Sequence, residues 1–130
     1  MTGEWAIRSS SGLTCTIGDT LLFTVTGTSA RAGSIYTKNK INVSNFSTLE
    51  VDVKISSAAS ANNGFCIGLA TGAGIKTTDE LSRYATKKSS KTVGEQTIFL
   101  DISGMTGSYY VVFFADVTSA SVSSVRLIGG

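Results

Sequence analysis

The feature that most constrains this chain is a hydrophobic pattern with a period of two residues. It is clearest between residues 49 and 55, where Leu, Val, Val and Ile alternate with Glu50, Asp52 and Lys54. Successive side chains of a β-strand point to opposite faces, so this pattern is typical of a strand with one buried and one solvated face. No segment shows the period of a long amphipathic helix, which argues against an α-helical fold.

The same period and a high content of β-branched residues predict strands along the whole chain. The clearest cover residues 20–26, 49–55, 65–70, 97–102, 109–115 and 122–128, and weaker ones cover 5–8, 13–17, 34–37 and 40–43. Gly, Ser and Asn separate them, as they do in the turns of antiparallel sheets. A helical pattern occurs at residues 78–84, where Thr78 would cap a helix of one or two turns.

These elements predict a single domain spanning residues 1–130, because the chain has the usual length of one domain. We expect an all-β fold, namely an antiparallel β-sandwich of jelly-roll type with about eight to ten strands and at most one short helical turn. Hydrophobic residues make up 42% of the chain, which is enough to fill the interior of such a sandwich.

The strand expected at residues 109–115 is apolar on both faces. Tyr110, Val112 and Phe114 fall on one face, and Tyr109 falls on the other together with Val111, Phe113 and Ala115. A strand in a two-layer sandwich turns one face to the core, so the second face needs another cover. Three covers are open at this point: the long segment 71–94 folding over it, a partner chain, or a ligand.

Composition excludes several classes of function. The chain has no His, so it has no Ser-His-Asp relay, imidazole base or imidazole metal ligand. The acid pairs that could serve glycoside hydrolysis are Asp101 with Asp116 and Glu50 with Asp52, but each acid lies beside Ser, Thr or Lys, as solvated residues do. We therefore predict that the protein is not an enzyme.

Nucleic acid and membrane are also unfavoured as partners. A net charge of +2 is too small to predict nucleic-acid binding, and no apolar stretch is long enough to predict membrane insertion. Cys15 and Cys66 are too few for a disulfide framework, and Cys66 is out of phase with the apolar residues around it. Both are predicted to be free cysteines that pack as small hydrophobic residues, with a bridge as the alternative.

Aromatic residues are the main candidates for binding a ligand, because an aromatic face next to hydroxyl and amide groups matches the C–H patches of a sugar. The candidates are Trp5, Tyr36, Tyr84 and one of Tyr109 and Tyr110. Packing in the core or at its rim is the alternative for each. Lys87 and Lys88 belong to a basic segment, residues 76–91, which is expected to be a mobile, solvated loop that could meet a negatively charged glycan.

No cofactor is expected, although a calcium ion is compatible with the acids near the predicted strand ends. Asp19, Asp101 and Asp116 are the candidate metal ligands, with Asp79 nearby in the helical pattern. Hard cations take oxygen ligands of this kind from loops. The alternative interpretation is that these aspartates form turns or cap loops.

Two runs of sequence resemble a known group of domains. Residues 40–53, KINVSNFSTLEVDV, and residues 100–112, LDISGMTGSYYVV, are similar to passages in jelly-roll domains of phage tail and receptor-binding proteins. Related galactose-binding-like sandwiches and carbohydrate-binding modules carry them too. The runs cover under a quarter of the chain, and sugar binders of these groups have a pair of aromatics in one loop that this sequence lacks.

The resemblance implies a non-catalytic binding module, a jelly roll on a phage virion or a bacterial surface that contacts cell-surface glycans. The implied location is the virion or the exterior of a cell, and the implied partner is a glycan or a virion protein. The alternative is a purely structural virion protein of a fibre, tail or capsid decoration. In that case the chain would assemble as a homo-oligomer, such as a trimer, through the second apolar face of residues 109–115.

Overall fold

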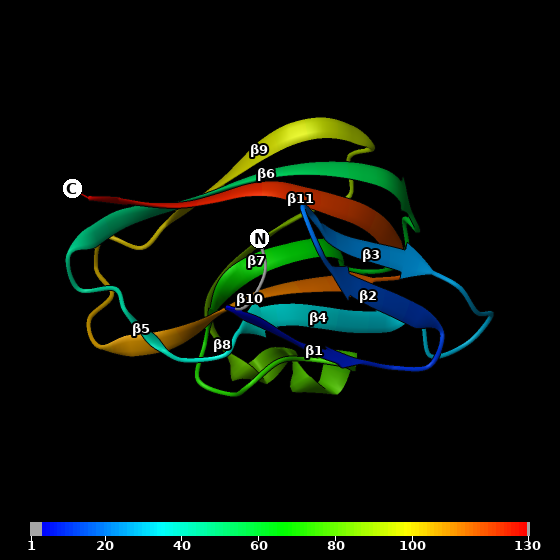
Figure 1. Ribbon diagram of the computed structural model, residues 1–130, viewed down its shortest axis with the longest axis horizontal. Helices are drawn as coiled ribbons and strands as arrows, with labels where there is room; N and C mark the ends of the chain where they lie inside the picture. The colour runs from blue at the N-terminus through cyan, green and yellow to red at the C-terminus, as the bar shows by residue number, and fades with distance from the viewer. Residues whose placement is uncertain (1–3, 130) are drawn as a thin grey trace.

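The computed structural model describes residues 4–129 and forms two antiparallel β-sheets stacked face to face (Figure 1). The first, here called the β10 sheet, has the order β1 (Trp5–Ser9), β4 (Ala32–Thr37), β10 (Ser108–Asp116), β7 (Gly64–Ala70) and β8 (Tyr84–Ser90), and β5 (Ile41–Asn42) also pairs with β10. The second, the β6 sheet, has the order β2 (Leu13–Ile17), β3 (Leu21–Val25), β11 (Thr118–Gly129), β6 (Phe46–Ala58) and β9 (Gly94–Asp101). A short 3-10 helix, η1 (Thr78–Arg83), lies outside the β10 sheet.

The chain crosses repeatedly between the two sheets, as it does in a jelly roll. It passes from β3 to β4, from β6 to β7, from β8 to β9 and from β10 to β11, each time changing sheet. This arrangement confirms the predicted fold class. In residues 4–129, no helix is long and apolar enough to span a membrane.

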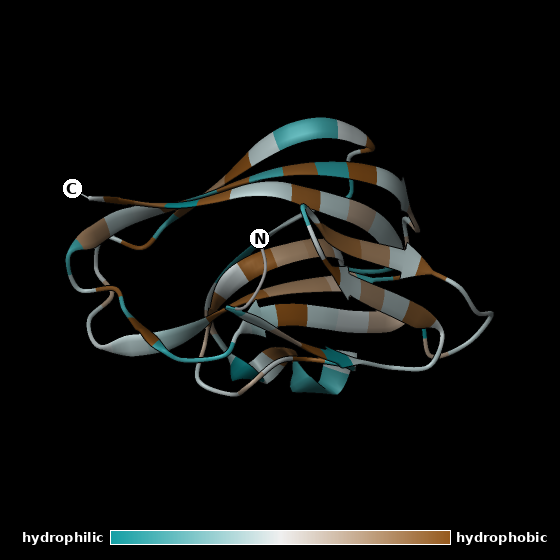
Figure 2. Ribbon diagram, in the orientation of Figure 1, coloured by the Kyte–Doolittle hydropathy of each residue, from teal (hydrophilic) through white to brown (hydrophobic). Residues whose placement is uncertain are grey.

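The predicted alternation places one apolar face of each strand in the interior. Along β6 the even-numbered polar residues face outward while Leu49, Val51, Val53 and Ile55 are fully or almost fully buried, and Figure 2 shows the resulting alternation of colour. Aromatic rings join the two sheets at the centre of this main core. The ring of Phe65 lies 5.5 Å from that of Phe23, centre to centre, and 6.3 Å from that of Phe113.

The second apolar face of β10 is covered by the chain itself. Val112 and Phe114 are fully buried in a separate small core on the outer side of the β10 sheet. Ile75, which is fully buried, and Leu81 lie in the segment 71–83, here called the strap, and pack onto this core. Of the three covers that the sequence left open, the structure therefore shows the chain's own segment.

Ten strands follow the predicted ones, and an eleventh, β8, was not predicted. The expectation that residues 76–91 form a mobile loop is wrong, because these residues form η1 and β8, an edge strand paired with β7. Lys87 is the register partner of Gly68 and Lys88 that of Ile67, so the two lysines point to opposite faces of the sheet. At an edge both faces reach solvent, and the apolar alternation that marks the other strands is lost.

The helix also differs from its prediction in type and start. It is a 3-10 helix, and its N-cap is Thr77 rather than Thr78, with no capping hydrogen bond from the side chain. Asp79 and Glu80 do lie in its first turn, and Arg83 lies in its last. The helix is held mainly by tertiary contacts, which are described below.

Both cysteines are free, as predicted. Cys66 is fully buried in the small outer core, and Cys15 packs against the main core. Burial raises the pKa of the Cys15 thiol to about 12 and that of the Cys66 thiol to about 11. Both thiols are therefore protonated and act as small hydrophobic groups.

Gly68 permits the close packing of β8 on β7, and this makes a first prediction. A Cβ at residue 68 would meet the backbone oxygen of Thr86 and would lie 2.7 Å from the ring of Tyr84. Gly68→Ala should therefore lower the free energy of unfolding by about 1–3 kcal/mol through overpacking. Urea denaturation followed by Trp5 fluorescence measures it. Gly104→Ala is the matched control, because a Cβ there meets no atom within 4 Å, and equal midpoints for the two variants would contradict the prediction.

Candidate functional sites on the two outer faces

Each sheet of the sandwich has an outer face, and the outer face of the β10 sheet is largely closed by the strap. The carboxylate of Glu80 fixes the strap at its centre. Its Oε2 accepts a hydrogen bond from Arg8 Nη2 at 2.8 Å and lies 2.6 Å from Arg83 Nη2, and its Oε1 accepts from the backbone N–H of Lys76 at 2.9 Å. A buried hydrogen bond, from the backbone N–H of Ile75 to Ser34 Oγ at 2.7 Å, joins the strap to β4.

Beyond the strap, two tyrosines remain half exposed on this face. The rings of Tyr36 on β4 and Tyr110 on β10 meet edge to face, with their centres 6.1 Å apart. The ammonium of Lys40 lies 5.7 Å from the centre of the Tyr110 ring. In residues 4–129 neither phenol takes part in a side-chain hydrogen bond, whereas the hydroxyl of Tyr84 donates to the backbone oxygen of Val112 at 2.9 Å. We call Tyr36, Lys40 and Tyr110 the tyrosine corner. The name refers only to this exposed cluster and not to the hydrogen-bonded tyrosine motif of Greek-key sandwiches.

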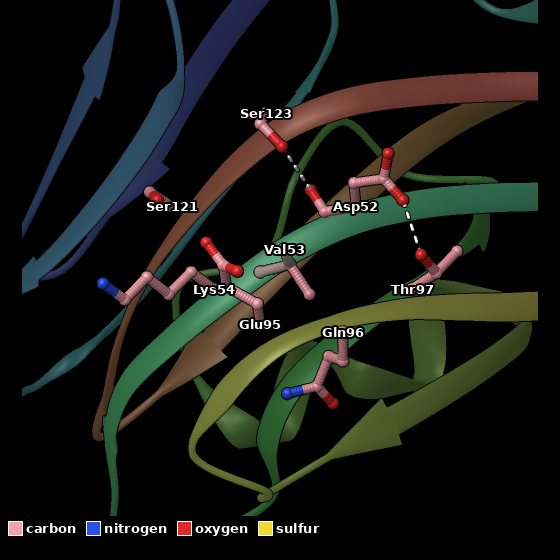
Figure 3. Close-up of a pocket in the computed structure, with 8 residues that line it drawn as sticks. All are labelled: Asp52, Val53, Lys54, Glu95, Gln96, Thr97, Ser121 and Ser123. Atoms are coloured by element: carbon pink, nitrogen blue, oxygen red, sulfur yellow. Dashed lines mark hydrogen bonds between the residues drawn. The ribbon is translucent and has the colours of Figure 1, made fainter.

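The outer face of the β6 sheet is polar and carries a groove of about 500 Å³. Figure 3 shows that β11, β6 and β9 contribute its lining side by side. The lining residues are Asp52, Val53, Lys54, Glu95, Gln96, Thr97, Ser121 and Ser123. Strand register builds this face, because Lys54 is paired with Glu95, Asp52 with Thr97, and Glu50 with Phe99.

An ion-pair network borders the groove and fixes its floor. Arg126 Nη1 donates to Asp52 Oδ2 at 2.9 Å, and Arg126 Nε lies 3.7 Å from Glu50 Oε2. Thr97 Oγ1 donates to Asp52 Oδ1 at 2.6 Å. The hydrogen bond from Arg126, followed by the one from Thr97, lowers the pKa of Asp52 to about 2. This carboxylate is therefore ionised at neutral pH and already has two partners.

The structure separates most of the aromatic residues that the sequence proposed as ligand-binding. Trp5 and Tyr109 pack against the main core, and the Trp5 ring lies 5.4 Å from that of Phe113. Tyr84 packs against the small outer core and is held by its hydroxyl. Tyr36 stays half exposed on the outer face, but its neighbour there is Tyr110, the second of the two tyrosines between which the sequence left the choice open.

The proposed lysines lie away from the tyrosine corner. Lys87 and Lys88 are both exposed on the edge strand β8, and β7 and β10 separate β8 from β4 in the sheet. Lys87 shares the outer face of the β10 sheet, since its register partner is Gly68. The structure therefore brings one proposed aromatic residue to an exposed site and leaves the two lysines outside it.

The candidate calcium ligands occupy three different places. Asp19 lies exposed in the turn between β2 and β3. Asp101 Oδ1 accepts hydrogen bonds from Ser103, at 2.9 Å from its backbone N–H and 2.7 Å from its hydroxyl. Asp116, which is 3% exposed, accepts from the backbone N–H and the side-chain amide of Asn63. In residues 4–129 no group of three His, Cys, Asp or Glu side chains could hold a metal ion.

The acid pairs considered for glycoside hydrolysis do not have the required arrangement. Asp101 ends β9 and Asp116 ends β10, which belong to different sheets. Glu50 and Asp52 share one face of β6, but both lie against the guanidinium of Arg126. A general acid needs a raised pKa, and the Asp52 carboxyl has the opposite shift.

Sequence reasoning missed the groove on the β6 sheet. Its local signal was visible in part, because Phe99 stands in the polar phase of its strand between Thr97 and Asp101. Phe99 is 51% exposed, which is high for a ring of this size. The register that places Phe99 beside Glu50 and Glu95 beside Lys54 joins residues 49 and 41 positions apart, and no local pattern specifies it.

Comparisons with known proteins bear on the fold. No family model and no curated protein matches the sequence. The secreted serine protease VesC from Vibrio cholerae is similar in structure with a TM-score of 0.52 and 14% identity, over 86% of this chain and 22% of that chain. A mutant of CBM29-2, a family 29 carbohydrate-binding module, is similar with a TM-score of 0.50 and 11% identity, over 95% of this chain and 90% of that chain.

A third similar structure is CBM86, a low-affinity xylan-binding module from the gut symbiont Roseburia intestinalis. Its TM-score is 0.47 at 10% identity, over 95% of this chain and 97% of that chain. At such identities the similarities to VesC and CBM29-2 show a shared fold alone, and this chain spans about a fifth of the VesC chain. The chain therefore has a β-sandwich fold like that of a carbohydrate-binding module, as the resemblance of its sequence implied.

The strap latch makes a second prediction, which concerns pH. The hydrogen bond from Arg8, then that from the Lys76 backbone, and the charge of Arg83 lower the pKa of Glu80 to about 2. The unfolded value is about 4.3, so the ionised carboxylate stabilises the folded state fully above that pH, and this contribution is lost as the pH falls toward 2. Glu80→Gln should lower the free energy of unfolding by about 1–2 kcal/mol at pH 7 and by less near pH 2.

Urea denaturation of both proteins across this pH range measures the difference. Asp79→Asn is the matched control, because Asp79 is an exposed neighbouring acid on the same helix with no ion pair in residues 4–129. Its midpoint should follow that of the wild type at every pH. A Glu80→Gln effect that stays constant from pH 7 to pH 2 would show that the latch does not depend on the carboxylate charge.

Proposed function

We propose that the protein is a non-catalytic module that binds cell-surface glycans from outside the cell, and that the tyrosine corner is its contact site. The observation that carries the proposal is the half-exposed pair of Tyr36 and Tyr110, whose hydroxyls have no hydrogen-bond partner in residues 4–129, with the ammonium of Lys40 beside it. Aromatic rings pack on the C–H faces of sugars, while phenol and ammonium groups hydrogen-bond to sugar hydroxyls. The similarity in fold to CBM29-2, a carbohydrate-binding module, supports the proposal.

The supporting geometry is preorganised. The ring of Tyr36 lies against Gly74 of the strap, where a Cβ would come within 2.7 Å of it. The Tyr36 ring thus packs on the strap, which is fixed by the hydrogen bonds of Glu80 and Ser34. A rigid aromatic platform loses little conformational entropy when it binds a ligand.

The biological setting that we propose is a phage tail or receptor-binding protein, or a bacterial surface protein. The sequence runs at residues 40–53 and 100–112 support this setting, and the secreted VesC protease supports a location outside the cell. The structural homo-oligomer was suggested by an uncovered face of β10. Because the strap covers that face, this observation no longer supports it. Light scattering would reveal a trimer directly.

The tyrosine corner makes a third prediction. Tyr110→Ala should weaken the binding of any glycan that an array or a cell-binding assay identifies by about tenfold, through the loss of stacking. Tyr110→Phe should keep most of the affinity, because it keeps the ring. Val93→Ala is the control for truncating an exposed side chain elsewhere on the surface, because Val93 lies exposed before β9. Binding that is unchanged in Tyr36→Ala and Tyr110→Ala would exclude this corner as the contact site.

A further inference from the structure

We propose that the groove on the β6 sheet is a second carbohydrate-binding site, which takes neutral glycan chains. This inference goes beyond the proposed function, because it uses other residues, on the opposite face of the sandwich. It follows from the free hydrogen-bonding groups of the groove, from an exposed aromatic ring beside it, and from its charge.

The floor of the groove offers hydrogen-bonding groups that are still free. Lys54 and Glu95 face each other across β6 and β9, yet neither forms an ion pair or a side-chain hydrogen bond in residues 4–129. An ammonium group donates to hydroxyl oxygens and a carboxylate accepts from hydroxyl hydrogens. Side by side, the two groups can bind neighbouring hydroxyls of one sugar, and Ser121 on β11 adds a third polar group.

Other lining groups already have partners and hold the floor in place. Asp52 is bound by Arg126 and Thr97, and the side-chain amide of Gln96 donates to the backbone oxygens of Thr92 and Gly94. Arg126 and Gln96 are thus positioning residues. This division leaves a small set of free groups on a floor whose other side chains are held in place, and such preorganisation favours the binding of a ligand.

An aromatic ring lies next to this floor. Phe99 is on the same face of β9 as Thr97, two residues further along, and it is 51% exposed. Phe99 and Glu95 lie four residues, about 13 Å, apart along β9, so one sugar of a chain can stack on Phe99 while another sugar of the same chain binds the free groups of the groove. A peptide ligand is less well matched, because a peptide needs apolar pockets for its side chains, and among residues 4–129 Val53 is the one apolar residue that lines the groove.

The charge of this outer face favours neutral glycans over acidic ones. The outer face of β6, β9 and β11 carries four carboxylates and two cations in the described residues, and Arg126 is already shared between Glu50 and Asp52. The residues of this set are Glu50, Asp52, Glu95, Asp101, Lys54 and Arg126. A uronic acid or phosphate group would be repelled by this excess of negative charge, whereas a neutral sugar is not.

The test is a titration of the ¹⁵N-labelled protein followed by NMR. The probes are neutral β-linked gluco-, manno- and xylo-hexasaccharides and, for comparison, an oligogalacturonate of the same length. We expect at least one neutral probe to shift the amides of Lys54, Thr97, Phe99 and Ser121, and the oligogalacturonate to bind the groove at least about tenfold more weakly. Shifts at Tyr36 and Tyr110 report separately on the tyrosine corner.

Variants assign the binding to side chains. Phe99→Ala should weaken the groove titration by about tenfold through the loss of stacking, and Glu95→Ala should weaken it by a similar factor. Glu95→Gln should retain part of the affinity and reduce the discrimination against oligogalacturonate. Val93→Ala is the matched control, since Val93 is 61% exposed and lies outside the groove.

Three outcomes would overturn the inference. The first is the absence of groove shifts with every neutral probe, and the second is an oligogalacturonate that binds the groove as tightly as they do. The third is a Phe99→Ala or Glu95→Ala variant that binds like the wild type. If groove shifts appear while Tyr36 and Tyr110 stay unmoved by every glycan, the groove is supported and the proposed tyrosine site fails.

Discussion

The structure depends on covering both faces of β10. Its inner residues, with Phe113 at the centre, complete the core between the sheets, and its outer residues, with Phe114 at the centre, are equally apolar. Neighbouring positions on a strand point in opposite directions, so one packing layer cannot bury both. Two layers therefore cover β10. The β6 sheet packs on its inner face, and the strap packs on its outer face. The strap needs a fixed position to do this, and Glu80, held by two arginines and a backbone N–H, provides it.

This arrangement also decides which surfaces are free for binding. The strap fills most of the outer face of the β10 sheet and leaves the tyrosine corner at its end. Within the described part of the chain the outer face of the β6 sheet carries no such cover, and its polar residues reach solvent across three adjacent strands. A sandwich built in this way presents different chemistry on its two outer faces. One side presents paired tyrosines with a lysine, and the other presents a polar groove with one phenylalanine.

Much of the fold could be predicted from the sequence, because burial imposes the two-residue period wherever one face of a strand meets the core. The period predicted the strands β6 and β10 and the two apolar faces of β10, and it favoured free cysteines over a disulfide bridge. It failed at β8, where Lys87 and Lys88 point to opposite faces of an edge strand and no apolar side chain marks the inner one. The candidate site was predicted less well. Of the proposed aromatic residues, Tyr36 stays half exposed, whereas Trp5 and Tyr84 pack against the two cores, and a sequence pattern does not distinguish an aromatic residue that packs from one that binds a ligand.

By itself, the sequence determined that this protein is a β-sandwich with its own complete interior, because alternation is a local property that each strand carries within a few residues. Only the tertiary structure decided which segment covers β10, which two tyrosines meet, and which charges face each other across β6 and β9. Those outcomes depend on strand register and on contacts between residues such as Arg8 and Glu80, which lie 72 positions apart in the chain. No short segment contains that information, since it arises only when the two sheets close on one another.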